Sequence, residues 1–346
     1  MTASTSNRAM IELFRNELEL CGIGPGQSVA VLSQGSQLRH YAKAFLAAAR
    51  DLGADAEDVN VPGADSADAA QRLRALGENA LSAHPGAMRA CLSADLVVDH
   101  LLLLFSKEQL AIQKADTRIL TVVEPLEVLE RLFPHRELRR RVEAAESRLK
   151  RARQLRFTNT LGTDVTFDLG KWPVLTEYGF TDSPGRWDHW PGGFLATLAN
   201  DRGVNGRVVM APGDIIYPLK RFVETPIEFV IRDGHVTQIG GATSSDELRN
   251  YMASYNDARA YAVSHIGWGL NERCLWDVDL PGIGMDGRAH YGNVLFSLGP
   301  DTEFGGTNDT SCHLDLPMKD CTLYLDGDVI VQNGRVIPDD MRVEGR

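Results

Sequence analysis

The first 150 residues alternate between short apolar runs and longer amphipathic stretches. Consecutive apolar residues predict strands buried on both faces, and apolar residues at helical spacing predict helices that cover them. Strands are predicted at residues 28–32, 58–62, 95–99 and 118–123. Helices are predicted at residues 8–20, 37–52 and 66–76. This alternation predicts an α/β domain with a parallel sheet, which we place at residues 1–150.

The pattern changes after a charged helix predicted at residues 135–154. Beyond it, apolar and polar residues alternate with period two, which is typical of strands with one buried face. Asp233-Gly234 and Asp326-Gly327 each separate two such strands, and Asp-Gly is a favoured hairpin turn. Residues 151–346 are therefore predicted to form a mixed α+β domain that is largely antiparallel β.

Three stretches of the second half follow neither period. Residues 176–194 include the run Pro-Gly-Arg-Trp-Asp-His-Trp-Pro, which we interpret as a loop held by a scaffold. Residues 264–271 place two glycines around a tryptophan directly after His265, and glycine lets the backbone approach a neighbour closely. Residues 285–290 and then 299–306 belong to a long loop that leads to His313. We expect functional side chains in these three stretches.

The run Ser-Cys-His-Leu-Asp-Leu at residues 311–316 is predicted to be a strand. Side chains alternate between the two faces of a strand, so His313 and Asp315 share one face and Leu314 and Leu316 point into a core. An imidazole and a carboxylate side by side can ligate a transition metal. By chance alone, one His-x-Asp triplet is unremarkable in a chain of this composition.

Adding His265 gives two imidazoles and one carboxylate. This set leaves coordination positions open, as in the facial triad of non-haem Fe(II) oxygenases. A structural zinc site would need four ligands, preferably with thiolates, and Cys312 lies on the opposite face of the predicted strand. His265, His313 and Asp315 are therefore our candidate metal ligands, with Fe(II) as the metal.

Composition narrows the possible partners and location. The 346 residues carry a net charge of −11, which argues against nucleic acid or an anionic membrane as a partner. No signal peptide is visible, and the longest apolar block, residues 101–105, is too short to span a bilayer. The five cysteines are scattered and odd in number, as expected for reduced thiols. We expect a cytoplasmic protein.

Three of these stretches closely resemble one known family. They are residues 265–270 (His-Ile-Gly-Trp-Gly-Leu), the loop at residues 177–194, and residues 299–315, which begin with Gly-Pro-Asp-Thr-Glu and end with Cys-His-Leu-Asp. Together they resemble 2,5-dihydroxypyridine 5,6-dioxygenase of bacterial nicotinate breakdown, and the likeness extends from about Ser28 to Asp328. The resemblance implies an Fe(II)-dependent, extradiol-type enzyme that opens the pyridine ring between C5 and C6 to give N-formylmaleamate. The family's iron ligands fall on the three candidates above.

The same resemblance implies an oligomer of identical chains and a fold shared with thermophilic aminopeptidases, which hold two metals. A two-metal hydrolase is therefore one alternative. By comparison with the peptidase motifs, however, four ligand positions carry Phe194, His265, Arg288 and Leu295 here. A second cation would then lack ligands and charge compensation. Two further alternatives are a dioxygenase for a related hydroxylated N-heterocycle and a metal-free binding protein.

One position departs from the family. A histidine proposed there to handle substrate protons precedes Ser-Lys-Glu-Gln, where this chain has Phe105. Phenylalanine cannot exchange a proton, so His189 and Glu177 are our candidates for catalysis. For contact with the planar substrate or its anionic oxygen, the candidates are Phe105, Arg186 and Trp187.

Overall fold

The computed structural model describes residues 3–63, 81, 83–104 and 106–344. The chain forms two compact units, and each unit is built from several separate segments of the sequence. The first unit comprises Met1–Pro134, Tyr178–Gly192 and Pro281–Ile283. The second unit comprises His135–Glu177, Gly193–Leu280 and Gly284–Arg346. That residues 1–150 and residues 151–346 are separate domains stays a prediction.

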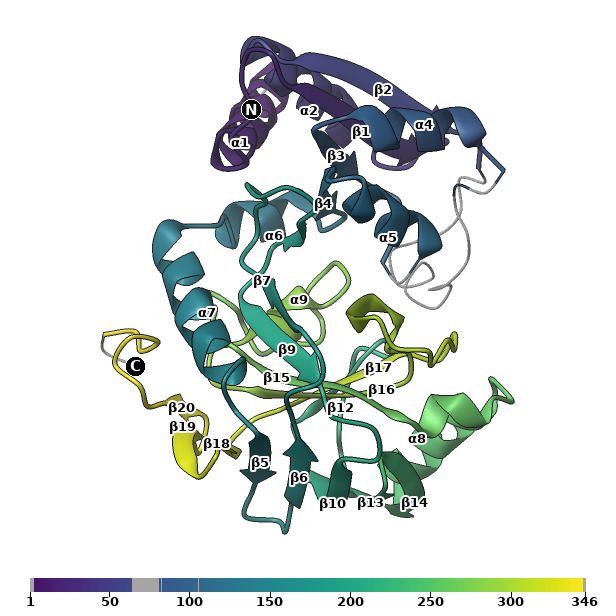
Figure 1. The fold of residues 1–346 in the computed structure, drawn as a ribbon, viewed down its shortest axis with the longest axis vertical. Helices are drawn as coiled ribbons and strands as arrows, with labels where there is room; N and C mark the ends of the chain where they lie inside the picture. The colour runs from purple at the N-terminus through teal and green to yellow at the C-terminus, as the bar shows by residue number, and fades with distance from the viewer. Residues whose placement is uncertain (1–2, 64–80, 82, 105, 345–346) are drawn as a thin grey trace. The chain divides into compact units, whose positions relative to one another are not determined.

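The first unit is a parallel sheet with helices, as predicted (Figure 1). Its strand order is β2-β1-β3-β4-β8, and every neighbouring pair is parallel. The strands are β1 Ser28–Gln34, β2 Asp55–Val61, β3 Leu96–Asp99, β4 Arg118–Val122 and β8 Trp187–Trp190. The helices are α1 Ala3–Leu20, α2 Arg39–Asp51, α4 Pro85–Ser93, α5 Lys107–Lys114 and α6 Leu126–Arg131. The helix predicted at residues 66–76 lies outside the described residues.

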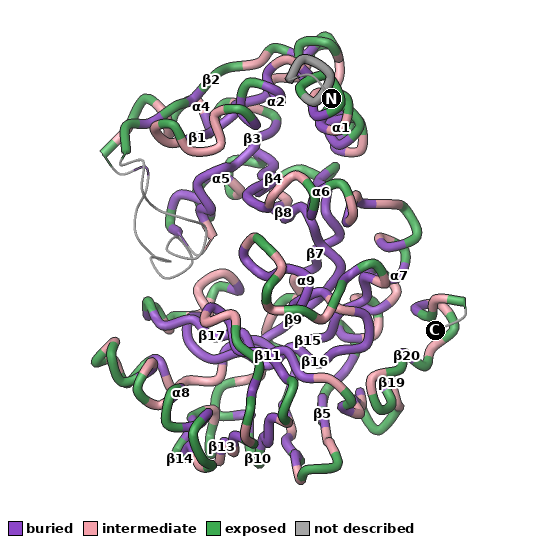
Figure 2. Tube along the Cα trace, turned by 180° about the vertical axis from the view of Figure 1, so that it is seen from behind, coloured by how far each residue is buried: buried purple, intermediate pink, exposed green. Residues whose placement is uncertain are grey.

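The central strands of this sheet are buried over their whole length. All residues of β3 and β4 are buried, which is why their sequences are nearly continuous apolar runs, and the edge strand β8 is buried as well (Figure 2). Helices α1 and α2 meet through Phe14 and Phe45, whose rings stack with centroids 4.0 Å apart. The apolar runs of the sequence thus predicted β1, β3 and β4 correctly, because these runs form the core of the first unit.

The second unit contains two large antiparallel sheets and a two-stranded one, β11-β12, which confirms the predicted fold class. The first sheet has the order β14-β13-β10-β6-β5-β18-β19-β20. Its strands are β5 Gln154–Thr158, β6 Asp164–Asp168, β10 Val204–Met210, β13 Ile227–Arg232, β14 His235–Gly241, β18 Thr322–Leu325, β19 Asp328–Gln332 and β20 Arg335–Val336. Both predicted Asp-Gly hairpins are confirmed, as β13–β14 and β18–β19.

The second sheet has the order β17-β16-β15-β9-β7. Its strands are β7 Val174–Glu177, β9 Phe194–Leu198, β15 Val263–Gly269, β16 Val294–Leu298 and β17 Leu314–Met318. Phe296 of this sheet packs against Phe157 and Phe229 of the first, with ring centroids 6.4 Å and 6.0 Å apart. Remaining elements are α7 Arg136–Leu149, α8 Thr243–Ala253, α9 Met285–Ala289, β11 Ile215–Ile216, β12 Arg221–Phe222, η1 Ala258–Tyr261 and η2 Thr302–Phe304.

Two predictions about local structure were wrong. The tryptophan-rich stretch is not wholly a loop, because Trp187–Trp190 forms β8 and pairs with β4. A parallel strand buried on both faces shows no alternation, so the period-two test missed it. The strand predicted at residues 311–316 begins only at Leu314, and His313 directly precedes it.

Candidate active site

His265, His313 and Asp315 come together at one edge of the second sheet. The order β17-β16-β15 places Asp315 two strands from His265, and Ser297 of β16 pairs with Asp315. The pairing of β15 with β16 shifts register between Val263 and Ile266, where His265 lies. Such an irregularity re-aims a side chain, and here it accompanies the convergence of His265 with two groups that lie far from it in sequence.

The donor atoms of these three side chains converge on one point. Oδ1 of Asp315 lies 3.2 Å from Nε2 of His265 and 3.1 Å from Nε2 of His313. One donor atom from each residue lies within 4.8 Å of the others. All three residues are buried. The arrangement is a small, preformed set of two nitrogen ligands and one oxygen ligand.

The charge states of this set suit a divalent transition metal. Burial lowers the pKa of His265, so its imidazole is neutral at pH 7 and has a lone pair to offer. Burial alone would raise the pKa of Asp315, but neighbouring His313 and Arg288 hold it well below its usual range. The carboxylate is therefore ionised. Two imidazoles and an anionic oxygen are the donor chemistry that non-haem Fe(II) sites use, so the residues fit that metal.

Two further residues bind the carboxylate of Asp315. The Ser297 hydroxyl lies 3.1 Å from Oδ1 and 2.7 Å from the Leu314 carbonyl oxygen, and it can donate its proton to either. Nε of Arg288 donates to Oδ2 at 2.6 Å. Arg288 was considered from the sequence, but Ser297 was not singled out. Its signal was weak but present: Ser297 is the only polar residue of the buried strand Val294–Leu298.

Glu303 is a second group that was not singled out from the sequence. It lies in η2, where the neighbouring Phe304 ring packs against the imidazole of His265 with centroids 5.9 Å apart. Burial, reinforced by the charge of Asp315, raises the pKa of Glu303 to about 8. In the absence of a nearby cation, this carboxyl group holds its proton at neutral pH.

Glu177 lies in the same sheet but not in the convergent set. It ends β7 and pairs with Phe194 of β9, which pairs in turn with Gly269 of β15. Gly269 is four residues along β15 from His265, and β7 is the sheet edge opposite β17. The buried Glu177 thus belongs to another part of the sheet, and its role in catalysis stays a prediction.

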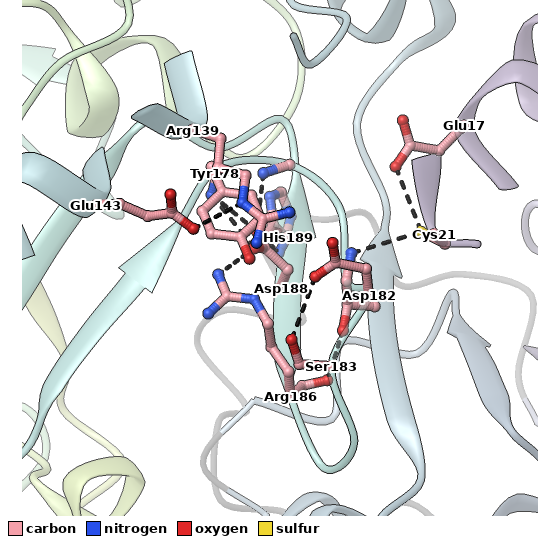
Figure 3. A network of polar contacts seen from close by, with 12 residues as sticks. Glu17, Cys21, Arg139, Glu143, Tyr178, Asp182, Ser183, Arg186, Asp188 and His189 are labelled. Atoms are coloured by element: carbon pink, nitrogen blue, oxygen red, sulfur yellow. Dashed lines mark hydrogen bonds and ion pairs between the residues drawn. The ribbon is translucent and has the colours of Figure 1, made fainter. Parts of the chain in front are cut away.

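The first unit gathers Arg186, His189 and their neighbours around Asp188 (Figure 3). The fully buried Asp188 accepts the backbone N–H groups of Tyr178, Gly179 and His189 at 2.9–3.1 Å. A guanidinium nitrogen of Arg186 donates to it at 2.6 Å, and that guanidinium lies 4.0 Å from the centroid of the Tyr178 ring. Arg186 is therefore held by a carboxylate and an aromatic ring.

The tautomer of His189 follows from its neighbour. Nδ1 lies 3.0 Å from the Pro191 carbonyl oxygen, which can only accept, so Nδ1 carries the hydrogen. In the neutral ring, Nε2 then carries the lone pair. Trp187 is 6% exposed, and its indole N–H donates to Thr121 at 3.0 Å. Phe105 lies outside the described residues.

A family model described as 2,5-dihydroxypyridine 5,6-dioxygenase matches residues 9–338. The chain belongs to this family. A 2,5-dihydroxypyridine 5,6-dioxygenase from Pseudomonas putida is 42% identical over 345 residues, which cover 97% of this chain and 99% of that protein. The solved structure of 2,5-dihydroxypyridine dioxygenase from Pseudomonas putida matches with a TM-score of 0.92, 42% identity, and coverage of 97% of this chain and 99% of that one.

The 2,5-dihydroxypyridine 5,6-dioxygenase family is an enzyme family, so the resemblance seen in the sequence is confirmed. A more distant neighbour is AmpT from Thermus thermophilus, with a TM-score of 0.56 and 14% identity over 96% of this chain and 99% of that one. This match shows the aminopeptidase-like fold alone. None of the described helices is long and apolar enough to cross a membrane.

Proposed function

We propose that this protein is a ring-cleaving dioxygenase that opens 2,5-dihydroxypyridine between C5 and C6 to N-formylmaleamate. The product contains the atoms of the substrate and of one O2, so no other reactant is required. The observation that carries the proposal is the convergence of His265, His313 and Asp315 in a chain of the 2,5-dihydroxypyridine 5,6-dioxygenase family. The related Pseudomonas putida protein carries that activity in its name.

The proposed cofactor is Fe(II), held by Nε2 of His265, Nε2 of His313 and Oδ1 of Asp315. Three protein ligands leave positions free for small molecules, whereas a structural metal site is closed by four. When bound, Fe(II) would supply the redox chemistry with O2 that protein side chains lack. Ser297 and Arg288 support this role because they hold the carboxylate between the two imidazoles.

The proposed proton acceptor is His189. Its Nδ1–H is engaged by the Pro191 carbonyl, which leaves the lone pair on Nε2 in the neutral ring. A base of this type removes a proton from a hydroxyl group of the substrate, and the pKa range of histidine suits that task at neutral pH. Glu177 remains the second candidate for proton transfer.

The proposed contacts to the substrate are those of Arg186, Trp187 and Phe105. Arg186, which Asp188 holds at 2.6 Å, is proposed to bind an anionic ring oxygen through its guanidinium group. Trp187 and Phe105 offer aromatic faces to a planar ring. We further propose a homo-oligomer in the cytoplasm; all five cysteines are free thiols, which suits a reducing compartment.

The test is anaerobic reconstitution with Fe(II), followed by O2 uptake and product mass with 2,5-dihydroxypyridine and related hydroxypyridines. We expect one O2 per ring and N-formylmaleamate as product. His313→Ala should abolish turnover, and the matched control His235→Ala should not, because His235 is an exposed histidine outside the site. Turnover of another hydroxypyridine alone would reject the substrate. No turnover of any, at one Fe(II) per chain, would reject the activity.

A further inference from the structure

The two carboxylate oxygens of Asp315 have different partners. Oδ1 faces the two imidazoles at 3.1–3.2 Å. Oδ2 accepts a hydrogen bond from Nε of Arg288 at 2.6 Å, and both side chains of this ion pair are 6–7% exposed. A carboxylate that chelates one metal ion, or that bridges two ions with one oxygen on each, needs both of its oxygens. Arg288 therefore limits what this carboxylate can ligate.

Arg288 is held in place on several sides. Its guanidinium carbon lies 4.3 Å from the centroid of the Tyr217 ring. Asn293 donates to the backbone carbonyl of Arg288 at 3.0 Å. Tyr217 also exchanges backbone hydrogen bonds with Asp315, at 2.9 Å and 3.3 Å. Arg288 and Asp315 are thus both positioned against the same tyrosine.

The tyrosine itself has little freedom. A Cβ atom at Gly284, where φ is +96°, would lie 2.2 Å from a ring carbon of Tyr217. A Cβ atom at Gly287 would lie 2.6 Å from the Tyr217 hydroxyl oxygen. Both glycines let the ring pack directly on the backbone around α9, which begins at Met285. The support for Arg288 is therefore built from backbone as well as side chains.

We propose that Arg288 is a positioning residue that presents only Oδ1 of Asp315 to the metal and so restricts the site to a single divalent cation. This inference rests on the proposed metal-binding role of the triad. The opposite charges of Asp315 and Arg288 cancel each other within the ion pair. One divalent ion adds a buried charge of +2, and a second ion would double that charge. The Arg288 guanidinium occupies the space beside Oδ2 that a second ion would need in order to bind that oxygen.

The test uses Mn²⁺ as the probe, with equilibrium dialysis for stoichiometry and electron paramagnetic resonance for nuclearity. Wild type should bind one Mn²⁺ per chain with an uncoupled six-line spectrum, even at excess Mn²⁺. Arg288→Met should bind one Mn²⁺ about 10- to 100-fold more weakly, because Asp315 loses the partner that orients it. Arg288→Lys should recover part of that loss. Arg288→Glu, which adds a carboxylate, should bind two spin-coupled ions.

The control is Arg207→Met, since Arg207 is a half-exposed arginine of the same unit paired with Glu228. Equal or tighter Mn²⁺ binding by Arg288→Met, or a single ion in Arg288→Glu, would overturn the inference. If the Arg288 variants do not fold, the wild-type measurement still tests the inference, because two coupled Mn²⁺ ions per wild-type chain would overturn it. Wild type that binds no divalent metal would instead reject the proposed function.

Discussion

Replacing Asp315 with alanine is expected to weaken the fold as well as abolish metal binding. The carboxylate is 5% exposed and forms a buried ion pair with Arg288. Removing it leaves a guanidinium without its counter-ion, and Arg288 is only 6% exposed. Breaking a buried pair in this way costs roughly 3–5 kcal/mol. This is a large part of the typical stability of a protein domain.

His313→Ala serves as the comparison, because it removes a metal ligand but leaves that ion pair intact. The lost contact between His313 and Asp315 is worth about 1.5–3 kcal/mol, since a charged group takes part. Both variants should lose Fe(II). Only Asp315→Ala should recover stability when Arg288→Met is added, since the second change removes the orphaned charge. The double variant should still bind no metal.

Chemical denaturation in the presence of a chelator measures these differences without a contribution from bound metal. The four proteins of the cycle, wild type, Asp315→Ala, Arg288→Met and the double variant, give the coupling energy of the pair. We expect a coupling of at least about 2 kcal/mol for a buried, hydrogen-bonded ion pair. Additive effects within about 0.5 kcal/mol, as for independent sites, would refute the reasoning.

Three further outcomes are expected. His189→Ala should lower kcat by about 10²- to 10⁴-fold with Fe(II) content unchanged, and a loss below twofold would exclude it as the base. Phe105→His should keep or raise kcat/KM for 2,5-dihydroxypyridine; a selective fall would instead mark Phe105 as a determinant of a different substrate. Burial raises the pKa of Asp214 to about 7, so its stabilising contribution is full below pH 4 and is lost as the pH rises through 7. This loss amounts to at most about 4 kcal/mol, and denaturation of Asp214→Asn at pH 5 and pH 8 should show a flatter pH dependence than wild type.

The elements that the sequence predicted are those specified by local pattern. Apolar runs predicted β1, β3 and β4, and the Asp-Gly turns predicted both hairpins, because burial and turn geometry depend on neighbouring residues. The strand β8 was missed because its four residues, Trp-Asp-His-Trp, are all buried and follow no period. Two of those residues are polar and are satisfied by contacts that only the folded chain provides.

The candidate site was predictable only in part, for a similar reason. His313 and Asp315 are two residues apart, so the local geometry of the chain alone brings them together. His265 joins them through sheet register, which no local pattern encodes, and here the family motif supplied the link. The contact between Arg288 and Asp315 spans 27 residues and depends on how α9 packs on Tyr217. Such support around a site is a property of tertiary structure.

The late arrival of β8 has a consequence for how the polypeptide is made. On the ribosome, four strands of the parallel sheet emerge by Val122, but the fifth, Trp187–Trp190, follows only after the chain has begun the second unit. Until then β4, whose five residues are all buried in the finished protein, is an apolar strand edge without its neighbour. A nascent or truncated chain ending near residue 150 would therefore expose this edge and be prone to aggregation. Residues 1–150 expressed alone should not give soluble protein. Residues 1–192 include β8 and can therefore complete the parallel sheet.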